Sequence, residues 1–254
     1  MRYWNYLVAL CHGDFGIYGV GTSHHVTDLI TPALPVTLQL TFFGLIIAVI
    51  ISFPLGVVAA LYRDRWPDQV IRVLSVIFIG TPSFWLAALL VLLGLNVLTG
   101  FPVSGPLPGI FEDFGGWTLR MFLPAVALAT PVVGQMTRVV RTSVVEELDR
   151  DYVRTALGAG IPRPVVIARN VLRNALITPV TVLGLRVGYL MGGAVVIEII
   201  FGIQGMGKVL VQGVQNSQVE VVQAAALVVA LAFIVVNIIV DMLYLLINPR
   251  IRSV

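Results

Sequence analysis

The chain has 254 residues, of which 58% are hydrophobic and only 11% charged, with a formal net charge of +3. Soluble domains carry about 25% charged residues, so this composition indicates a membrane protein, and the small charge gives no basis for nucleic-acid binding. Cys11 is the only cysteine, which excludes an internal disulfide and a thiolate metal cage.

Five segments are apolar and long enough to cross a bilayer core of about 30 Å, for which a helix needs roughly 20 apolar residues. The third contains Arg120, Pro124 and Pro131; prolines are tolerated in membrane spans because neighbouring groups take up the freed carbonyls. We therefore expect an all-α, polytopic membrane helical bundle. Its five transmembrane helices are predicted over 36–61, 70–98, 117–140, 175–200 and 222–247.

The arginines indicate the orientation of these spans. Those of the 61–69 turn, the 138–173 segment and the C-terminus lie on alternate connections and therefore on one side of the membrane. The positive-inside rule places that side in the cytoplasm. We expect a cytoplasmic C-terminus, an extracytoplasmic segment 1–35, and a transmembrane domain over 36–254. With five spans the N-terminus lies outside, as though a first, inward-starting helix preceded this chain.

The cytoplasmic segment 151–170 reads DYVRTALGAGIPRPVVIARN. Asp149 or Asp151 is suited to cap a helix, and Gly160 followed by Pro162 is suited to stop it; Pro164 suits the first turn of a second helix. The first helix has an apolar stripe at helical spacing. Two interpretations follow: a helix lying on the membrane surface, or a helix docked in a partner's groove. The stripe consists of Tyr152, Val153, Ala156 and Leu157.

This segment resembles the signature loop of ABC-transporter permease subunits, whose pattern is E-A-A, three residues, G, nine residues, then I-x-L-P. Ala156, Gly160 and Leu172 match that pattern literally. The departures resemble one branch, the peptide/nickel permeases of the oligopeptide and dipeptide B-subunit type. In that branch DYVRTA, LRNAL, GGAVVIE and a terminal VDMLYLLINPRIR are typical, and the resemblance covers nearly the whole chain.

The resemblance implies a membrane-spanning permease subunit of an ATP-driven importer for dipeptides, oligopeptides, nickel or a related solute, in the cell (inner) membrane of a prokaryote. The implied partners are a second homologous permease, two cytoplasmic ATPases, an extracytoplasmic substrate-binding protein and the lipid bilayer. ATP and magnesium would bind the ATPases, so no cofactor is expected on this chain. The implied cytoplasmic coupling loop, at about 141–174, contains Tyr152, Val153, Arg154, Thr155, Ala156, Leu157, Gly160 and Leu172. Members of this branch normally have one further span before the first found here.

The stretch GIQGMGK at 202–208 spells most of a phosphate-binding loop, but Val209 stands where a Ser or Thr hydroxyl must reach magnesium. We interpret it as an outer loop with tight turns and not as a nucleotide site. We predict no catalytic and no metal-binding residues. The transport function would need partner ATPases, so the chain itself is not expected to be an enzyme.

Small residues recur at every fourth position of the fourth span, a spacing that lets helices approach closely. Ionisable residues within a span usually face the bundle interior or water. These two patterns predict a surface in the pathway or at a subunit interface, or simple helix packing. The residues are Gly184, Arg186, Gly188, Gly192 and Glu198. The alternative function is a stand-alone secondary transporter or channel, although no paired repeat of the kind common in such proteins is evident.

Overall fold

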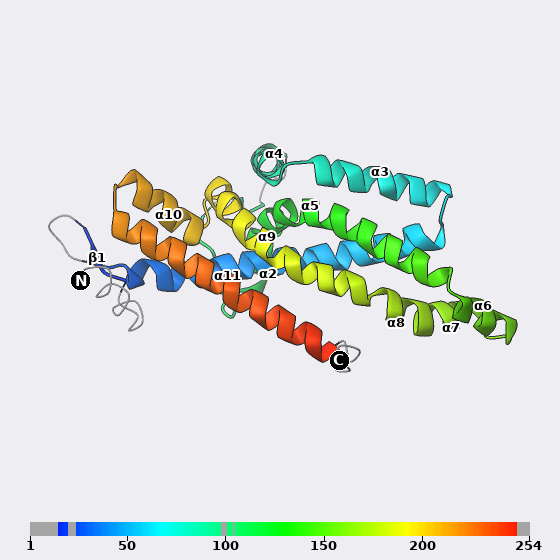
Figure 1. Ribbon diagram of the computed structural model, residues 1–254. Coiled ribbons are helices and arrows are strands. Elements are labelled where there is room, and N and C mark those ends of the chain that lie inside the picture. Colours follow the sequence, from blue (N-terminus) through cyan, green and yellow to red (C-terminus); the bar gives the residue numbers. More distant parts are fainter. Residues whose placement is uncertain (1–14, 20–23, 98–100, 104, 248–254) are drawn as a thin grey trace.

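The computed structural model describes residues 15–19, 24–97, 101–103 and 105–247. Within this part the chain is almost entirely helical and forms an elongated bundle (Figure 1), which confirms the expected all-α membrane architecture. Four helices are long and apolar enough to span a membrane: α2 (Thr27–Leu61), α5 (Phe114–Leu148), α9 (Ile177–Phe201) and α11 (Val219–Ile247). Predictions that concern 1–14 and 248–254 lie outside the described residues.

The first and third spans are longer than predicted. Helix α2 begins at Thr27 and not at 36, so the helix that contains the first span already starts within the segment 1–35. Pro32 and Pro35 lie inside this helix. Helix α5 extends to Leu148, beyond the predicted end at 140.

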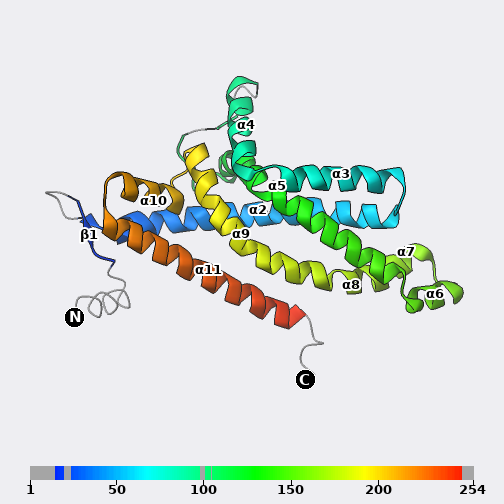
Figure 2. The same cartoon turned by 45° about the horizontal axis from the view of Figure 1, so that its top comes forward.

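The second predicted span, 70–98, is not one straight helix. It consists of α3 (Trp66–Gly80) and α4 (Ser83–Asn96), whose axes differ by 96°, and Figure 2 shows α4 standing across the long axis of the bundle. The cause is local: Thr81 precedes Pro82 and is extended, with ψ 112°, because the proline ring disfavours helical geometry in the residue before it. The broken pair therefore replaces the predicted continuous span.

Helix α5 lies at the centre of the bundle. In its most apolar window 67% of the residues are buried, compared with 17–28% for the other three spans. This explains why the least apolar of the predicted spans is stable: protein and not lipid surrounds it. Arg120 is buried, and its two terminal guanidinium nitrogens donate hydrogen bonds to the backbone carbonyls of Val103 and Phe201, so the charged end of this side chain is paired within the chain although its Nε atom is not.

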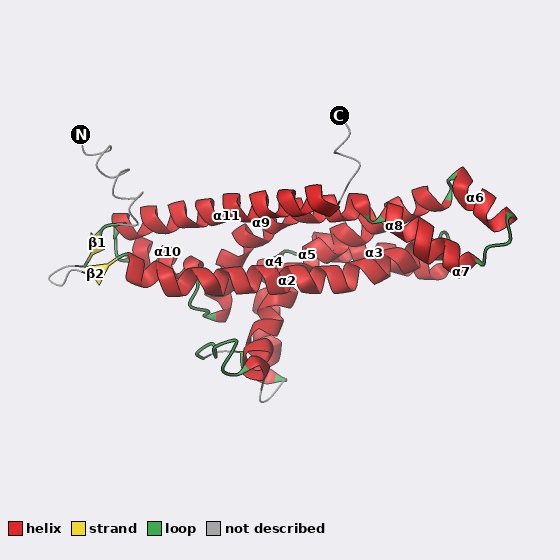
Figure 3. Ribbon diagram, turned by 90° about the horizontal axis from the view of Figure 1, so that it is seen from below, coloured by secondary structure: helices red, strands yellow, loops and turns green. Residues whose placement is uncertain are grey.

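The short elements lie at opposite ends of the bundle (Figures 1 and 3). One end carries α6 (Asp151–Gly158), α7 (Arg163–Val166), the π-helical turn η1 (Ile167–Val171) and α8 (Leu172–Ala175), together with the turn between α2 and α3. The other end carries α10 (Met206–Gln215) and the antiparallel pair β1 (Ile17–Tyr18) and β2 (His24–His25), in which Ile17 is opposite His25. The arginine-rich 61–69 turn and 138–173 segment therefore share one end, as their alternation predicted, whereas the C-terminal arginines lie outside the described residues.

Candidate functional site

The turn at Gly160 ends α6 in a defined way. Gly160 has φ +81°, and its N–H donates to the carbonyl of Leu157 while that of Ile161 donates to the carbonyl of Ala156. This pair of bonds around a left-handed residue is the Schellman motif, which satisfies carbonyls at the helix end. Pro162 follows at once, so the chain leaves α6 at a fixed angle and enters α7.

The apolar stripe of α6 packs mainly on the chain's own helices. Val153 is 5% exposed and Tyr152 and Ala156 are half-buried, in a cluster that includes Val140 and Val144 of α5. Burial raises the pKa of the Tyr152 hydroxyl above its usual value, which keeps it protonated as a donor. Three of the four stripe residues therefore hold α6 against the bundle, whereas the sequence had left open the membrane surface and a partner's groove.

The fourth stripe residue, Leu157, and other residues of the α6–α7 segment face outward. Arg154 and Thr155 are exposed, and three large apolar side chains around the turn remain 40–46% exposed. Leu172 is only partly buried and packs on the inner cluster. We call the outward set the loop tip. Its apolar members are Leu157, before the turn, and Ile161 and Val165, after it. Periodicity within α6 could not have predicted the two that follow Gly160.

The glycine-rich stretch 202–208 encloses an internal carboxylate. Glu198 is fully buried, and its Oε2 accepts from the N–H of Gly207 at 2.8 Å while its Oε1 accepts from the hydroxyl of Thr37 at 2.5 Å. The Thr37 hydroxyl in turn accepts from the N–H of Met206. A Cβ atom at Gly205 would overlap the Glu198 carboxylate.

This arrangement explains the resemblance to a phosphate loop. A phosphate-binding loop and this stretch both need glycines, because backbone N–H groups at a helix N-terminus approach an acidic group closely. Here that group is the side chain of Glu198, which extends from α9 to the start of α10. Glu198 was predicted in the pathway or at a subunit interface. It is instead enclosed by α2, α9 and α10 of its own chain, because a carboxylate at this depth requires donors and this loop supplies them.

The small residues of α9 divide between two roles. A Cβ atom at Gly184 or Gly188 would overlap Val240 or Phe233 of α11, so these two glycines serve packing within the chain and not a subunit interface. At Gly192 nothing lies within 4 Å of a Cβ position. Gly192 therefore has an open face within the described part of the chain.

Gly192 is part of a continuous exposed stripe on α9, with residues spaced alternately by three and four. Its members lie on one face of the helix, away from the described part of the chain. Arg186, next to this stripe, is half-buried and has no ion-pair partner among the described residues. The stripe comprises Leu185, Tyr189, Gly192, Val196 and Ile199.

A polar pocket of about 490 Å³ lies between α5, α9 and the end of α3. No motif in the sequence marks this pocket, although its lining residues on α5 recur at intervals of three and four. Gln135 is one of its lining residues, and the Oε1 atom of this side chain is buried without a hydrogen-bond partner, which is unusual for a buried polar group. The polar lining residues are Gln135, Arg138, Thr142, Ser143, Glu146 and Thr178.

The fold is that of the membrane subunits of known importers. The structure of the MetNI methionine ABC transporter in an inward-facing conformation matches 87% of this chain and 97% of its own chain, with a TM-score of 0.67 and 15% identity. An amino acid ABC transporter crystallised with histidines matches with a TM-score of 0.59 and 19% identity, over 88% and 94% of the two chains. At these identities the likeness concerns the fold alone.

Proteins found by sequence comparison share a higher identity with this chain than the two solved structures do. The chain is 38% identical to the glutathione transport system permease protein GsiC of Salmonella choleraesuis and 35% identical to the probable D,D-dipeptide transport system permease protein DdpB of Escherichia coli, over 99% of this chain and 79% of each relative. It is 37% identical to a putative peptide transport system permease protein of Brucella abortus, over 98% and 77%. The family model for the binding-protein-dependent transport system inner membrane component matches residues 52–253. The chain therefore belongs to this family, as a permease subunit of an ABC importer of the peptide-transport type.

Proposed function

We propose that the chain is one of two permease subunits that form the pathway of an importer for short peptides. The relatives named above transport a D,D-dipeptide, peptides or glutathione, and all of these solutes carry amide bonds and carboxylates. The polar pocket offers matching groups in the amide of Gln135, the guanidinium of Arg138 and the hydroxyl of Thr142. Peptide amides and carboxylates are the solute groups that these side chains would bind.

The loop tip is the proposed contact with a cytoplasmic ATPase, and this is the observation that carries the proposal. Leu157, Ile161 and Val165 are large apolar side chains exposed at the arginine-rich end of the bundle, where the positive-inside rule places the cytoplasm. Lipid covers the exposed apolar residues of the spans, whereas these lie on a loop that extends beyond the spans (Figure 1). A soluble partner with an apolar groove is the matching surface.

The exposed stripe of α9 is the proposed contact with the second permease. Gly192 at its centre allows a close helix–helix approach, and the polar pocket beside the stripe would then face the shared pathway. Movement of the docked loop tip would reach this face through α8, which leads into α9 at Ile177. An ATP-driven change in the partner is thereby converted into alternating access.

Nucleotide chemistry is assigned to the partner ATPases and not to this chain. The one phosphate-loop-like stretch is occupied by Glu198, because the N–H of Gly207 already donates to this carboxyl group and is not free for a phosphate. A substrate-binding protein is expected at the opposite end of the bundle, where α10 lies, and the C-terminus is expected in the cytoplasm.

Substitution at the loop tip tests the coupling proposal. Ile161→Asp adds a charge to a side chain that is 42% exposed, so folding and membrane insertion should be unaffected. Burial of that charge in an ATPase groove would be costly, and we expect co-purification of the ATPases and substrate-stimulated ATP hydrolysis in proteoliposomes to fall at least tenfold. Ala156→Asp is the comparison variant: it places a charge in the inner cluster and should lower the thermal stability of the permease itself. Unchanged hydrolysis and uptake in Ile161→Asp would refute the assignment.

A further inference from the structure

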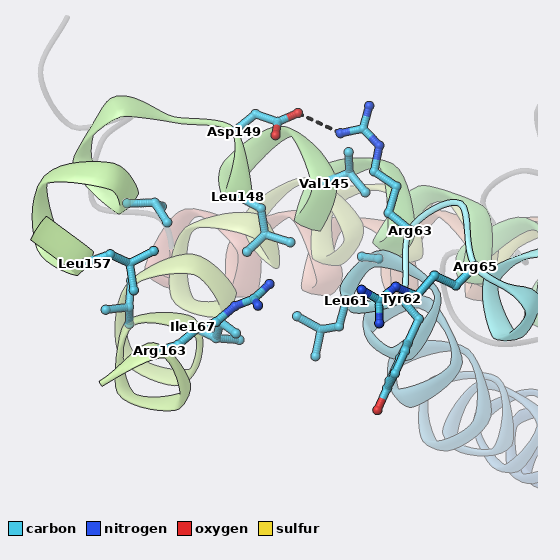
Figure 4. Close-up of a pocket in the computed structure, with 13 residues that line it drawn as sticks. Leu61, Tyr62, Arg63, Arg65, Val145, Leu148, Asp149, Leu157, Arg163 and Ile167 are labelled. Atoms are coloured by element: carbon cyan, nitrogen blue, oxygen red, sulfur yellow. Dashed lines mark hydrogen bonds and ion pairs between the residues drawn. The ribbon is translucent and has the colours of Figure 1, made fainter. Parts of the chain in front are cut away.

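A second pocket lies at the arginine-rich end, between the α2–α3 turn, the end of α5 and the α6–α7 segment (Figure 4). Its volume is about 640 Å³, within the range of roughly 300–1,000 Å³ that is usual for small-molecule sites. The floor is apolar, with Leu61, Val153 and Val166 among its lining residues. The rim is cationic.

Three arginines and one aspartate line this pocket. Asp149 is already paired with Arg63 at 2.9 Å, and no ion pair is recorded among the described residues for Arg65 or Arg163. Three positive charges and one negative charge leave a surplus of two. In Figure 4 the side chains of Arg65 and Arg163 extend toward the space beside Leu61 from opposite sides. Two unpaired guanidinium groups that converge in this way form a site for an anion.

The neighbouring aromatic residues indicate where this pocket lies in the membrane. Tyr62 is 47% exposed and Trp66 is 75% exposed, at either end of the same turn. Exposed Tyr and Trp side chains gather at the headgroup level of a bilayer. Beyond them, α3 exposes Val70, Val73 and Ile77 as a surface suited to acyl chains. The cationic rim therefore lies at headgroup level, next to an apolar surface that continues into the hydrocarbon region.

We propose that this pocket binds the phosphate headgroup of an anionic phospholipid. The phosphate lies between Arg65 and Arg163, and the glycerol and upper acyl chain rest on Leu61 and the exposed side of α3. An anionic amphiphile matches both parts of the site: the charge surplus selects the phosphate, and the apolar floor excludes a fully hydrated ion. This inference is independent of the transported solute.

The test measures which lipids the full-length chain retains. The purified protein is equilibrated with mixed micelles that contain equal amounts of phosphatidylglycerol and phosphatidylcholine, and native mass spectrometry counts the lipids that stay bound. We expect wild type to retain phosphatidylglycerol preferentially. Each basic residue at a membrane surface strengthens binding of anionic lipid by roughly fivefold, so Arg65→Gln/Arg163→Gln should reduce the preference roughly 25-fold. Arg65→Lys/Arg163→Lys keeps both charges and should retain most of it.

The matched control is Arg169→Gln/Arg173→Gln, which removes two exposed charges from the same segment but none from the pocket lining. It should keep the preference of wild type. An equal loss in this control would mean that diffuse charge and not the pocket selects the lipid. Displacement of the lipid by millimolar glycerol 3-phosphate would identify a soluble phosphate as the occupant. If the Gln variant keeps its lipid and instead loses a co-purifying cytoplasmic protein, the pocket is a protein contact and the proposal is overturned.

Discussion

Gly160 shows how one residue fixes the direction of the coupling loop. Its positive φ completes the Schellman motif, and a Cβ atom there would have nothing within 4 Å. The requirement for glycine therefore comes from the backbone and not from crowding. This role was predictable from sequence, because a glycine followed two residues later by a proline is a typical helix stop.

Gly160→Val should re-aim the loop tip. A β-branched residue held in the left-handed region costs about 1–3 kcal/mol, and the loop can relieve this strain by abandoning the turn. We expect wild-type membrane insertion with a severalfold loss of substrate-stimulated ATP hydrolysis. Gly160→Asn is the control, since Asn tolerates this conformation better, and it should lose much less. Equal activity of the Val and Asn variants would show that the turn does not set the coupling geometry.

Glu198 shows the opposite case, in which a residue's role was hidden in the sequence. Its hydrogen-bond donors are the hydroxyl of Thr37 and the backbone N–H of Gly207. Only folding brings α2 next to the loop that precedes α10. No local pattern distinguishes a carboxylate in the pathway from one that caps a helix of its own chain.

Removal of this carboxylate should loosen α10. Glu198→Ala leaves the Gly207 N–H buried without this acceptor, at a cost of about 1–3 kcal/mol, whereas the Thr37 hydroxyl keeps the carbonyl of Ala33 as an acceptor. Thermal unfolding of the purified protein in detergent should show a clear loss of stability. Glu198→Gln keeps one carbonyl acceptor and should lose less. A Glu198→Ala protein as stable as wild type would contradict the capping role.

At the scale of elements, the central position of α5 depends on close helix contacts. A Cβ atom at Gly56 of α2 would lie 2.5 Å from the Cβ of Val140 and 2.9 Å from the carbonyl oxygen of Thr137. These are rigid atoms of α5, so α2 and α5 approach each other as closely as they do only because residue 56 lacks a side chain.

Gly56→Ala should therefore force α2 and α5 apart. Overpacking of a tight contact typically costs about 1–3 kcal/mol, which would appear as a lower unfolding temperature in detergent. Gly192→Ala is the matched helical control, because a Cβ atom there has open space around it; the stability of the isolated chain should be unchanged. If both variants unfold at the temperature of wild type, the α2–α5 contact is not as tight as described.

The whole molecule has a consistent polarity, with arginine-rich connections at one end and α10 at the other (Figure 1). This polarity leads to a prediction of topology. In a Cys11→Ser background, Ala159→Cys and Asn216→Cys place single thiols at exposed positions of the two ends. An impermeant maleimide added to intact cells should label position 216 and leave 159 unlabelled until the membrane is opened. The reverse pattern would invert the orientation and remove the basis for ATPase docking at the loop tip.

The sequence alone determined the class of fold, the number of apolar segments, the grouping of the arginines and the family resemblance. These follow from local composition and order: a bilayer requires long apolar helices, and charges that cannot cross it collect on the connections. It also located the break at Gly160, because glycine and proline act on their own backbone.

Only the tertiary structure decided which side of each helix has a partner. It placed the α6 stripe against α5, Glu198 against Thr37, and Gly184 and Gly188 against α11. In a soluble protein the apolar face of a helix marks the core, but in lipid both the buried and the exposed faces are apolar. The sequence pattern of a span is therefore similar on every side, and only contacts between residues far apart in the chain show which surfaces remain for partners.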